Sequence, residues 1–272
     1  MDEADREYAK GLARALAGAV IFAVPLMMTM EMWWLGFYMD RERLLLFIVL
    51  NLVVLAGISH FAGFEPSQGW GDDVMDGFAA FGVGLIASVV MLALLGILTP
   101  DMPLEEIVGK SALQAVPASI GAVLARKQLG ARERDKASER KQAGYPGQLF
   151  LMGVGALFLA FNVAPTEEMP LIAQKMTAWH ALALVGLSVV LLHAFVYAIG
   201  FAGQEQPAEG NTFATTLLHY SIAGYGIALI ISLYVLWTFG RTDETSPATV
   251  AQMVAVMGFP ASLGAALARL IV

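Results

Sequence analysis

The chain has 272 residues, of which 58% are hydrophobic and 14% are charged, and its formal net charge is −7. This balance does not suit a soluble globular domain, and the acidic residues lie mostly in connecting segments, which argues against a nucleic-acid partner. The lack of cysteine excludes disulfides, thiolate metal sites and cysteine nucleophiles.

Apolar runs along the chain predict membrane-spanning helices, each long enough for a hydrocarbon layer of roughly 30 Å. In chain order, they cover residues 15–39, 44–64, 78–98, 105–126, 148–169, 178–201, 214–238 and 249–271. The first run is longer than the core of a signal peptide, so we expect it to be retained. Lys110 interrupts the fourth run, and a re-entrant segment is the competing interpretation there. The predicted fold is an all-α, polytopic transmembrane bundle of about eight helices.

The basic residues are distributed unevenly and predict the topology. Arg6, Lys10 and Arg14 precede the first helix. Seven further basic residues fall in one central loop: Arg126, Lys127, Arg132, Arg134, Lys136, Arg140 and Lys141. The positive-inside rule places both groups in the cytoplasm, which requires an even number of crossings between them. Four helices satisfy this requirement and leave both chain termini cytoplasmic.

The two halves of the chain resemble each other. Residues 117–126 read PASIGAVLAR and residues 260–269 read PASLGAALAR, a spacing of 143 residues. At a spacing of 137 residues, the matched pairs are Gly18 with Gly155, Thr29 with Thr166 and Glu31 with Glu168. At a spacing of 142 residues, Gly82 matches Gly224 and Gly84 matches Gly226. The four helices of each half therefore correspond in order.

This similarity predicts the domain organisation. A first four-helix repeat covers residues 1–126, a basic cytoplasmic linker covers 127–147, and a second four-helix repeat covers 148–272. Because each copy crosses the membrane an even number of times, both enter from the same side. The repeats should therefore be parallel, related by an axis along the membrane normal.

Glu31 is the carboxylate most deeply placed in an apolar run. It lies about eight residues, or roughly 12 Å of helix, before Asp40. A charge inside the hydrocarbon layer costs on the order of 3 kcal/mol, so the side chain should face a protein interior or a water-filled cavity. This position predicts a functional residue. The competing interpretation is a structural glutamate, protonated or hydrogen-bonded to a neighbouring helix.

Glu168, the counterpart of Glu31, follows Glu167 in a segment flanked by Pro165 and Pro170. Two prolines should interrupt the fifth helix and free backbone carbonyls, as at the ion sites of broken membrane helices. The alternative is that the helix ends at Pro165 and both glutamates lie in an interfacial turn, which the nearby Lys175 also favours.

Two short motifs, Thr29-x-Glu31 and Thr166-x-Glu168, would place carboxylates and hydroxyls at matching depth in the two repeats. Such hard oxygen ligands suit Ca²⁺, Mn²⁺, Na⁺ or a proton, and the sequence does not identify a metal. The same glutamates could exchange protons if desolvation raised their pKa values. We therefore predict transport of a small ion, a cation, through a site at the repeat interface, and exchange of this ion for protons is one option. The predicted ligands or proton acceptors are Glu31, Glu168, Thr29, Thr166 and Glu167.

Other polar residues inside the predicted helices could relay protons or line a path: His60, His219, Asn51 and Asn162. Hydrogen bonding between helices is the competing interpretation for each of them. The sequence contains no nucleotide-binding loop, zincin helix or catalytic triad, so we predict neither an enzyme nor a cofactor. A passive ion channel with Glu31 in its pore, and a non-transporting membrane sensor or assembly protein, are the alternatives to a transporter.

The run from Pro25 to Gly36, with its TMEMWWLG core, resembles an uncharacterised family of bacterial integral membrane proteins, a domain of unknown function. The resemblance implies a location in the bacterial inner membrane and no particular activity. The expected partners are the lipid bilayer and a small ion, and the sequence leaves homo-oligomerisation open.

Overall fold

A computed structural model describes residues 3–61, 69–130, 144–198 and 213–271, and these residues form helices and short connections without a strand. Eight helical runs among them are long and apolar enough to cross a membrane: Ala9–Met27, Arg41–Phe61, Trp70–Leu94, Leu104–Ala125, Tyr145–Val163, Ala178–Val196, Leu217–Thr238 and Pro247–Ala268. The predicted all-helical transmembrane architecture is confirmed. The fourth run, for which a re-entrant segment competes, is one continuous helix.

The chain divides into two compact units, Met1–Lys141 (unit 1) and Gln142–Val272 (unit 2). Most of the predicted basic linker, residues 131–143, lies outside the described residues, as do the predicted ends of two spans at 62–64 and 199–201.

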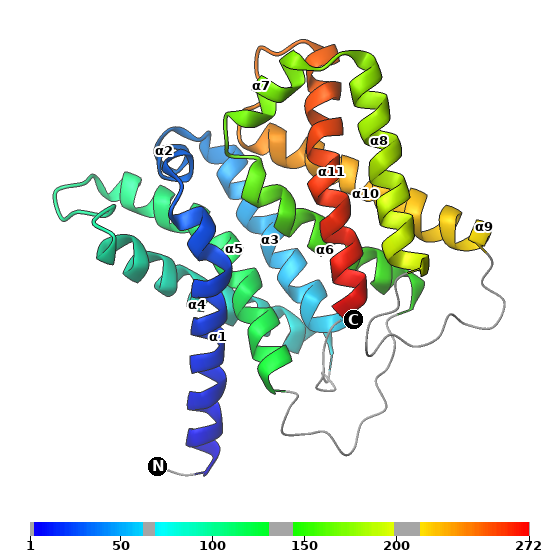
Figure 1. Cartoon of the computed structure of the whole chain (residues 1–272). Coiled ribbons are helices and arrows are strands. Elements are labelled where there is room, and N and C mark those ends of the chain that lie inside the picture. The colour runs from blue at the N-terminus through cyan, green and yellow to red at the C-terminus, as the bar shows by residue number, and fades with distance from the viewer. Residues whose placement is uncertain (1–2, 62–68, 131–143, 199–212, 272) are drawn as a thin grey trace. The chain divides into compact units, whose positions relative to one another are not determined.

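Unit 1 is organised around its last helix, α5. Its helices are α1 (Glu3–Met27), α2 (Met30–Tyr38), α3 (Arg41–Phe61), α4 (Trp70–Leu94) and α5 (Leu104–Gly130). All four preceding helices pack against α5, and α1 and α4 pack against it most extensively (Figure 1). As a result, α5 is buried without interruption from residue 109 to residue 123.

The outer helices of unit 1 expose apolar side chains in stripes with a spacing of four residues. Leu45, Val49 and Val53 form such a stripe on α3, and their exposed fractions are 63%, 47% and 62%. A helix that is apolar on both its buried and its exposed faces is typical of a membrane span, where lipid covers the outer face.

Unit 2 is organised in the same way around its own last helix, α11. Its helices are α6 (Tyr145–Val163), α7 (Glu168–Lys175), α8 (Ala178–His193), α9 (Phe213–Thr216), α10 (Ala223–Thr238) and α11 (Pro247–Ile271), with π-helical turns η2 (Ala194–Ala198) and η3 (Leu217–Ile222). Helices α6, α7, α8 and α10 all pack against α11. Its element order thus parallels that of unit 1, with α6 and α7 in the places of α1 and α2.

A pair of facing glycines lies at a close contact between the first and last long helices of each unit. In unit 1, a Cβ atom at Gly18 would overlap the Gly121 carbonyl oxygen and the Ala125 side chain. In unit 2, a Cβ atom at Gly155 would overlap the Gly264 carbonyl oxygen. Small residues let membrane helices approach closely, where dispersion forces and not hydrophobic burial hold them together. Each unit therefore relies on glycine where its first and last long helices cross.

The first predicted span, 15–39, is wrong in its second half, because α1 ends at Met27 and α2 begins at Met30. Pro25 lacks the N–H that would continue the hydrogen-bond ladder, and Thr29 between the helices has an extended backbone (φ −99°, ψ 129°). The third span begins at Trp70, not at residue 78, so Asp72, Asp73 and Asp76 lie in α4 and not in a loop. Acidic residues in the first turn interact favourably with the helix dipole.

Candidate functional site

The turn between α1 and α2 contains two of the predicted site residues, Thr29 and Glu31. The Thr29 hydroxyl donates to the Leu26 carbonyl oxygen at 2.8 Å, and the Trp33 indole N–H donates to the Met27 carbonyl oxygen at 2.6 Å. Both bonds satisfy carbonyls that the end of α1 leaves without an intrahelical partner. The hydroxyl of Thr29 therefore caps the end of α1.

Glu31 lies in the first turn of α2 and is half-buried. It lies beyond the first candidate span, which ends at Met27, and the depth predicted for its carboxylate stays a prediction. Among the described residues it makes no hydrogen bond or ion pair. The carboxylate is thus available to a cation at the end of unit 1 where α1 ends.

The turn between α6 and α7 repeats the threonine arrangement. The Thr166 hydroxyl donates to the Val163 carbonyl oxygen at 2.8 Å, at the same separation of three residues as Thr29 and Leu26. Arg241 donates through Nη1 to Glu167 Oε1 at 2.6 Å and through Nη2 to the Pro165 carbonyl oxygen. Helix α6 ends before Pro165, as the second interpretation predicts, but only Glu167 lies in the turn, because Glu168 is the first residue of α7.

Glu168 is exposed at the start of α7. The Thr166 hydroxyl, which donates to the Val163 carbonyl oxygen, also interacts with the Glu168 carboxylate. This interaction, the backbone N–H of Glu168 and, more weakly, the charge of Arg241 hold the pKa of the carboxyl below its ordinary value. A lowered pKa keeps Glu168 ionised at neutral pH, so the raised pKa that proton exchange at this residue would need is absent. The predicted meeting of Glu31 and Glu168 at a repeat interface stays a prediction.

The predicted path residues occupy different surroundings. His219 is exposed on η3, and its carbonyl oxygen accepts from the Tyr145 hydroxyl at 2.8 Å. Asn162 bonds within its own helix, donating to the Phe158 carbonyl oxygen at 2.8 Å. His60 contacts Asp73 at 3.0 Å at the junction of α3 and α4. Of these four residues, only Asn51 forms a hydrogen bond to the buried helix α5.

Buried polar side chains gather where α3, α4 and α5 pack together. The polar core of unit 1 consists of five residues that are at most 3% exposed: Asn51 on α3, Ser88 on α4, and Ser111, Gln114 and Ser119 on α5. The Asn51 amide donates to Ser119 Oγ at 2.9 Å, and the Gln114 amide approaches the Leu26 carbonyl oxygen at 3.4 Å. Gly84 brings α4 onto α5 at Ser119, one helical turn from Ser88.

The hydrogen bonds of the polar core fix the direction of both amides. The Ser119 hydroxyl donates its only hydrogen to the Val116 carbonyl oxygen at 2.7 Å. It can therefore only accept a hydrogen bond from Asn51. A carbonyl oxygen likewise only accepts, which turns the Gln114 NH₂ group toward Leu26. Among the described residues, no donor reaches Asn51 Oδ1 or Gln114 Oε1, and the buried hydroxyls of Ser88 and Ser111 have no partner either.

Two buried charges flank the polar core, Lys110 on α5 and Asp73 on α4, which are 8% and 1% exposed. Lys110 Nζ pairs with Glu106 Oε1 at 2.5 Å, one turn earlier on the same helix. Gly36 of α2 lies directly against the Lys110 backbone, where no larger residue fits. The sequence analysis treated Lys110 only as an interruption, although the i, i+4 spacing of Glu106 and Lys110 is itself a signal of an ion pair.

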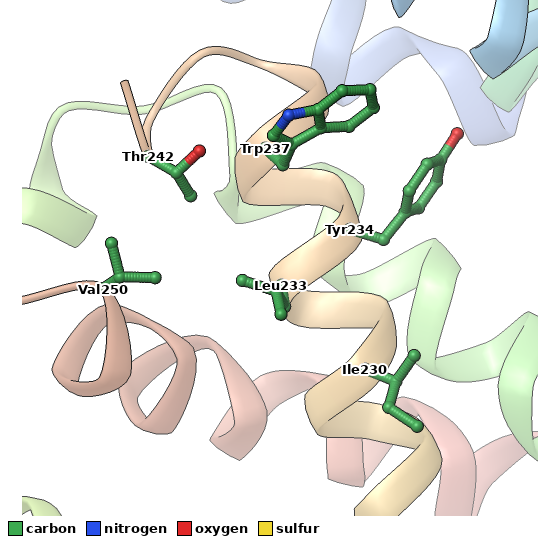
Figure 2. A pocket seen from close by; sticks show the side chains of 6 residues that line it. All are labelled: Ile230, Leu233, Tyr234, Trp237, Thr242 and Val250. Atoms are coloured by element: carbon green, nitrogen blue, oxygen red, sulfur yellow. The ribbon is translucent and has the colours of Figure 1, made fainter. Parts of the chain in front are cut away.

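A shallow groove of about 410 Å³ lies on unit 2 between α10 and α11. Its lining is apolar apart from the polar ends of a few side chains, and it consists of Ile230, Leu233, Tyr234, Trp237, Thr242 and Val250 (Figure 2). The groove opens outward along a candidate membrane span, where lipid chains would fill it. It offers no group for ion binding or catalysis.

Comparison with curated proteins and with solved structures finds no match. A sequence model of one family, described as "Putative integral membrane protein (DUF2391)", matches residues 11–272. The match covers both units and all eight candidate spans almost completely. We conclude that the chain belongs to this family of integral membrane proteins, whose function is unknown.

Proposed function

We propose that the protein moves a small monovalent cation across the membrane and that the polar core of unit 1 is part of its path. The observation that carries the proposal is the pair of amide oxygens, Asn51 Oδ1 and Gln114 Oε1, buried without a donor inside membrane-spanning helices. A buried acceptor without a partner costs about 1–3 kcal/mol. A bound cation would supply the missing partner.

The chemistry of the polar core favours a monovalent ion. Its ligands would be amide and hydroxyl oxygens, which are hard and uncharged. Divalent ions such as Ca²⁺ are usually held by several carboxylates, and the described residues contain no cluster of three His, Cys, Asp or Glu side chains. Sodium, potassium or a proton carried by water is therefore the substrate class we propose.

The proposed duplication of the chain strengthens this assignment. The facing glycines and the capping threonines recur in both units, which supports two copies of one architecture. At the spacings of the two halves, however, the counterparts of Asn51, Ser88, Ser111 and Gln114 are Ser188, Ile230, Val254 and Met257. Unit 2 thus keeps the helix packing while it replaces most of the polar core. A purely architectural role would be expected in both copies.

The buried charges in the described part of unit 1, Asp73 and Lys110, lie toward the two ends of this path. Glu106 and Lys110 lie toward the end where α5 begins, and Asp73 and His60 lie where α3 ends and α4 begins. Glu31, on the helix that covers Lys110, would attract cations at the first end. Because none of the five polar-core residues is a carboxylate, proton exchange would depend on the end groups. This arrangement favours a passive channel as the second candidate.

Reconstituted vesicles test the proposal. We expect wild-type protein to carry Na⁺, K⁺ or Rb⁺ faster than empty vesicles and to carry Ca²⁺ and Mn²⁺ no faster. Replacement of Gln114 by the isosteric Met should reduce the monovalent flux at least tenfold, while Asn162→Leu, which removes a satisfied amide in unit 2, should not. A pH change in the lumen that tracks the cation indicates exchange, and flux that only follows its gradient indicates a channel. Absence of any cation flux would leave the non-transporting alternative and refute the proposal.

A further inference from the structure

His60 and Asp73 bring a titratable ring and a buried carboxylate together at the junction of α3 and α4. His60 Nδ1 lies 3.0 Å from Asp73 Oδ2, and the side chain of Asp73 is 1% exposed while that of His60 is 36% exposed. The imidazole also stacks on the indole of Trp70, with centroids 4.3 Å apart and planes inclined by 16°. One face of the ring is therefore covered by an aromatic system, and its edge meets a carboxylate.

We propose that His60, Asp73 and Trp70 form a proton-binding site. An ionised carboxylate only accepts hydrogen bonds, so Nδ1 of His60 carries a hydrogen in both forms of the ring, and the additional proton binds at Nε2. The resulting imidazolium lies against the Asp73 carboxylate and over the electron-rich face of Trp70, which attracts a cation. Water reaches the half-exposed ring and delivers the proton.

The helix ends favour the charged form. His60 lies in the last turn of α3, where the partial negative charge of the helix end stabilises a cation. Asp73 lies in the first turn of α4, where the partial positive charge stabilises an anion. Proton uptake thus converts a hydrogen bond between a neutral imidazole and an ionised carboxylate into an ion pair, in which each charge lies at the favourable end of a helix.

Other charged groups surround this site. Asp72 and Asp76 lie on the same turns of α4, and the Ser59 hydroxyl approaches Asp76 at 3.3 Å. Helix α1, which packs on α4, carries Lys10 and Arg14 near its start. Arg126 and Lys127, whose side chains lie outside the described part of the chain, follow at the end of α5. The nearby acids favour the imidazolium, Lys10 and Arg14 oppose it, and Asp73 contacts the ring directly at 3.0 Å.

Tryptophan fluorescence and histidine NMR of the full-length protein in lipid nanodiscs test the inference, which does not rest on cation transport. A stacked imidazolium quenches indole emission, so we expect emission to fall reversibly as the pH is lowered from 8 to 5. His60→Gln and Trp70→Phe should each remove this transition, whereas Trp237→Phe should keep it. Asp73→Asn should weaken proton binding at His60, because it removes the adjacent opposite charge.

NMR of protein labelled at its four histidines gives a second readout that does not depend on fluorescence. The resonance lost in His60→Gln identifies His60, and its titration in wild type and Asp73→Asn measures the proton affinity directly. A His60 resonance that titrates identically in both proteins would overturn the inference, and so would an unchanged fluorescence transition in His60→Gln. Absence of cation flux in vesicles would leave the proton site intact and refute only the proposed function.

Discussion

Replacement of Gly18 by Ala tests whether the crossing of α1 and α5 depends on the absence of a side chain. The added methyl group would overlap the Gly121 carbonyl oxygen and the Ala125 methyl group, and neither belongs to a flexible side chain that could move away. Overpacking costs about 1–3 kcal/mol, and rigid backbone on the receiving side places this contact at the upper end of that range. Replacement of glycine by alanine in a helix interior stabilises the helix by up to about 1 kcal/mol, which offsets part of this cost. We therefore expect a net loss of stability of about 2 kcal/mol.

Gly82→Ala is the matched control, because a Cβ atom at Gly82 in α4 meets no atom within 4 Å. This variant should gain up to about 1 kcal/mol from helix propensity alone. The two variants should thus differ by about 3 kcal/mol in the free energy of unfolding. Unfolding in mixed micelles with increasing denaturing detergent measures that difference.

Unit 2 gives an independent repetition of the same experiment. Gly155→Ala would overlap the Gly264 carbonyl oxygen, whereas a Cβ atom at Gly226 meets nothing within 4 Å. Gly155→Ala should therefore destabilise and Gly226→Ala should not. If Gly18→Ala and Gly155→Ala proved as stable as their controls, the packing argument for both units would be refuted.

Two further predictions concern the turn between α6 and α7. Thr166→Val removes the hydrogen bond that lowers the pKa of Glu168, so the carboxyl should titrate at a higher pH by NMR. The lowered pKa stabilises the folded protein at pH values above the ordinary pKa of 4.5, and this stabilisation is lost as the pH falls through the pKa of the folded state. The stability of the variant should therefore decline less steeply in acid. Arg241→Gln removes the bonds to Glu167 and to the Pro165 carbonyl oxygen. Since Glu167 is 66% exposed, thermal unfolding should show a loss of about 1 kcal/mol, and a loss below the measurement error would contradict a stabilising role for this ion pair.

The helical spans could be predicted from the sequence because each of them leaves a local mark. Runs of about 20 apolar residues have few alternatives to a membrane span. The end of α1 was missed because Pro25 occurs inside a helix that continues for two more residues, and only the extended backbone at Thr29 ends it. The hydrophobic periodicity of the sequence does not indicate this helix end, because apolar residues continue on both sides of the turn.

The candidate site was predicted less well, because burial and orientation depend on residues far apart in the chain. The partner of Asn51 is Ser119, 68 residues later, and that bond decides which amide oxygen stays unpaired. Arg241 reaches Glu167 across 74 residues. In helices that are apolar all round, the sequence does not distinguish the lipid-facing side from the protein-facing side. Asn51 could be identified as polar and intramembrane, while its role required the packing of three helices.

Cation flux through vesicles containing Asn51→Leu, compared with Ser232→Ala, tests the central claim most directly. The first variant removes an amide oxygen without a donor, and the second removes a buried hydroxyl of unit 2 that donates to the Ala228 carbonyl oxygen at 2.7 Å. Loss of the Asn51 hydrogen bond and relief of its unpaired oxygen offset each other, so its stability should change by less than about 1 kcal/mol. We predict that monovalent cation flux falls at least tenfold in Asn51→Leu and stays at the wild-type rate in Ser232→Ala. Equal flux in folded Asn51→Leu and wild-type protein would contradict a cation path through the polar core of unit 1.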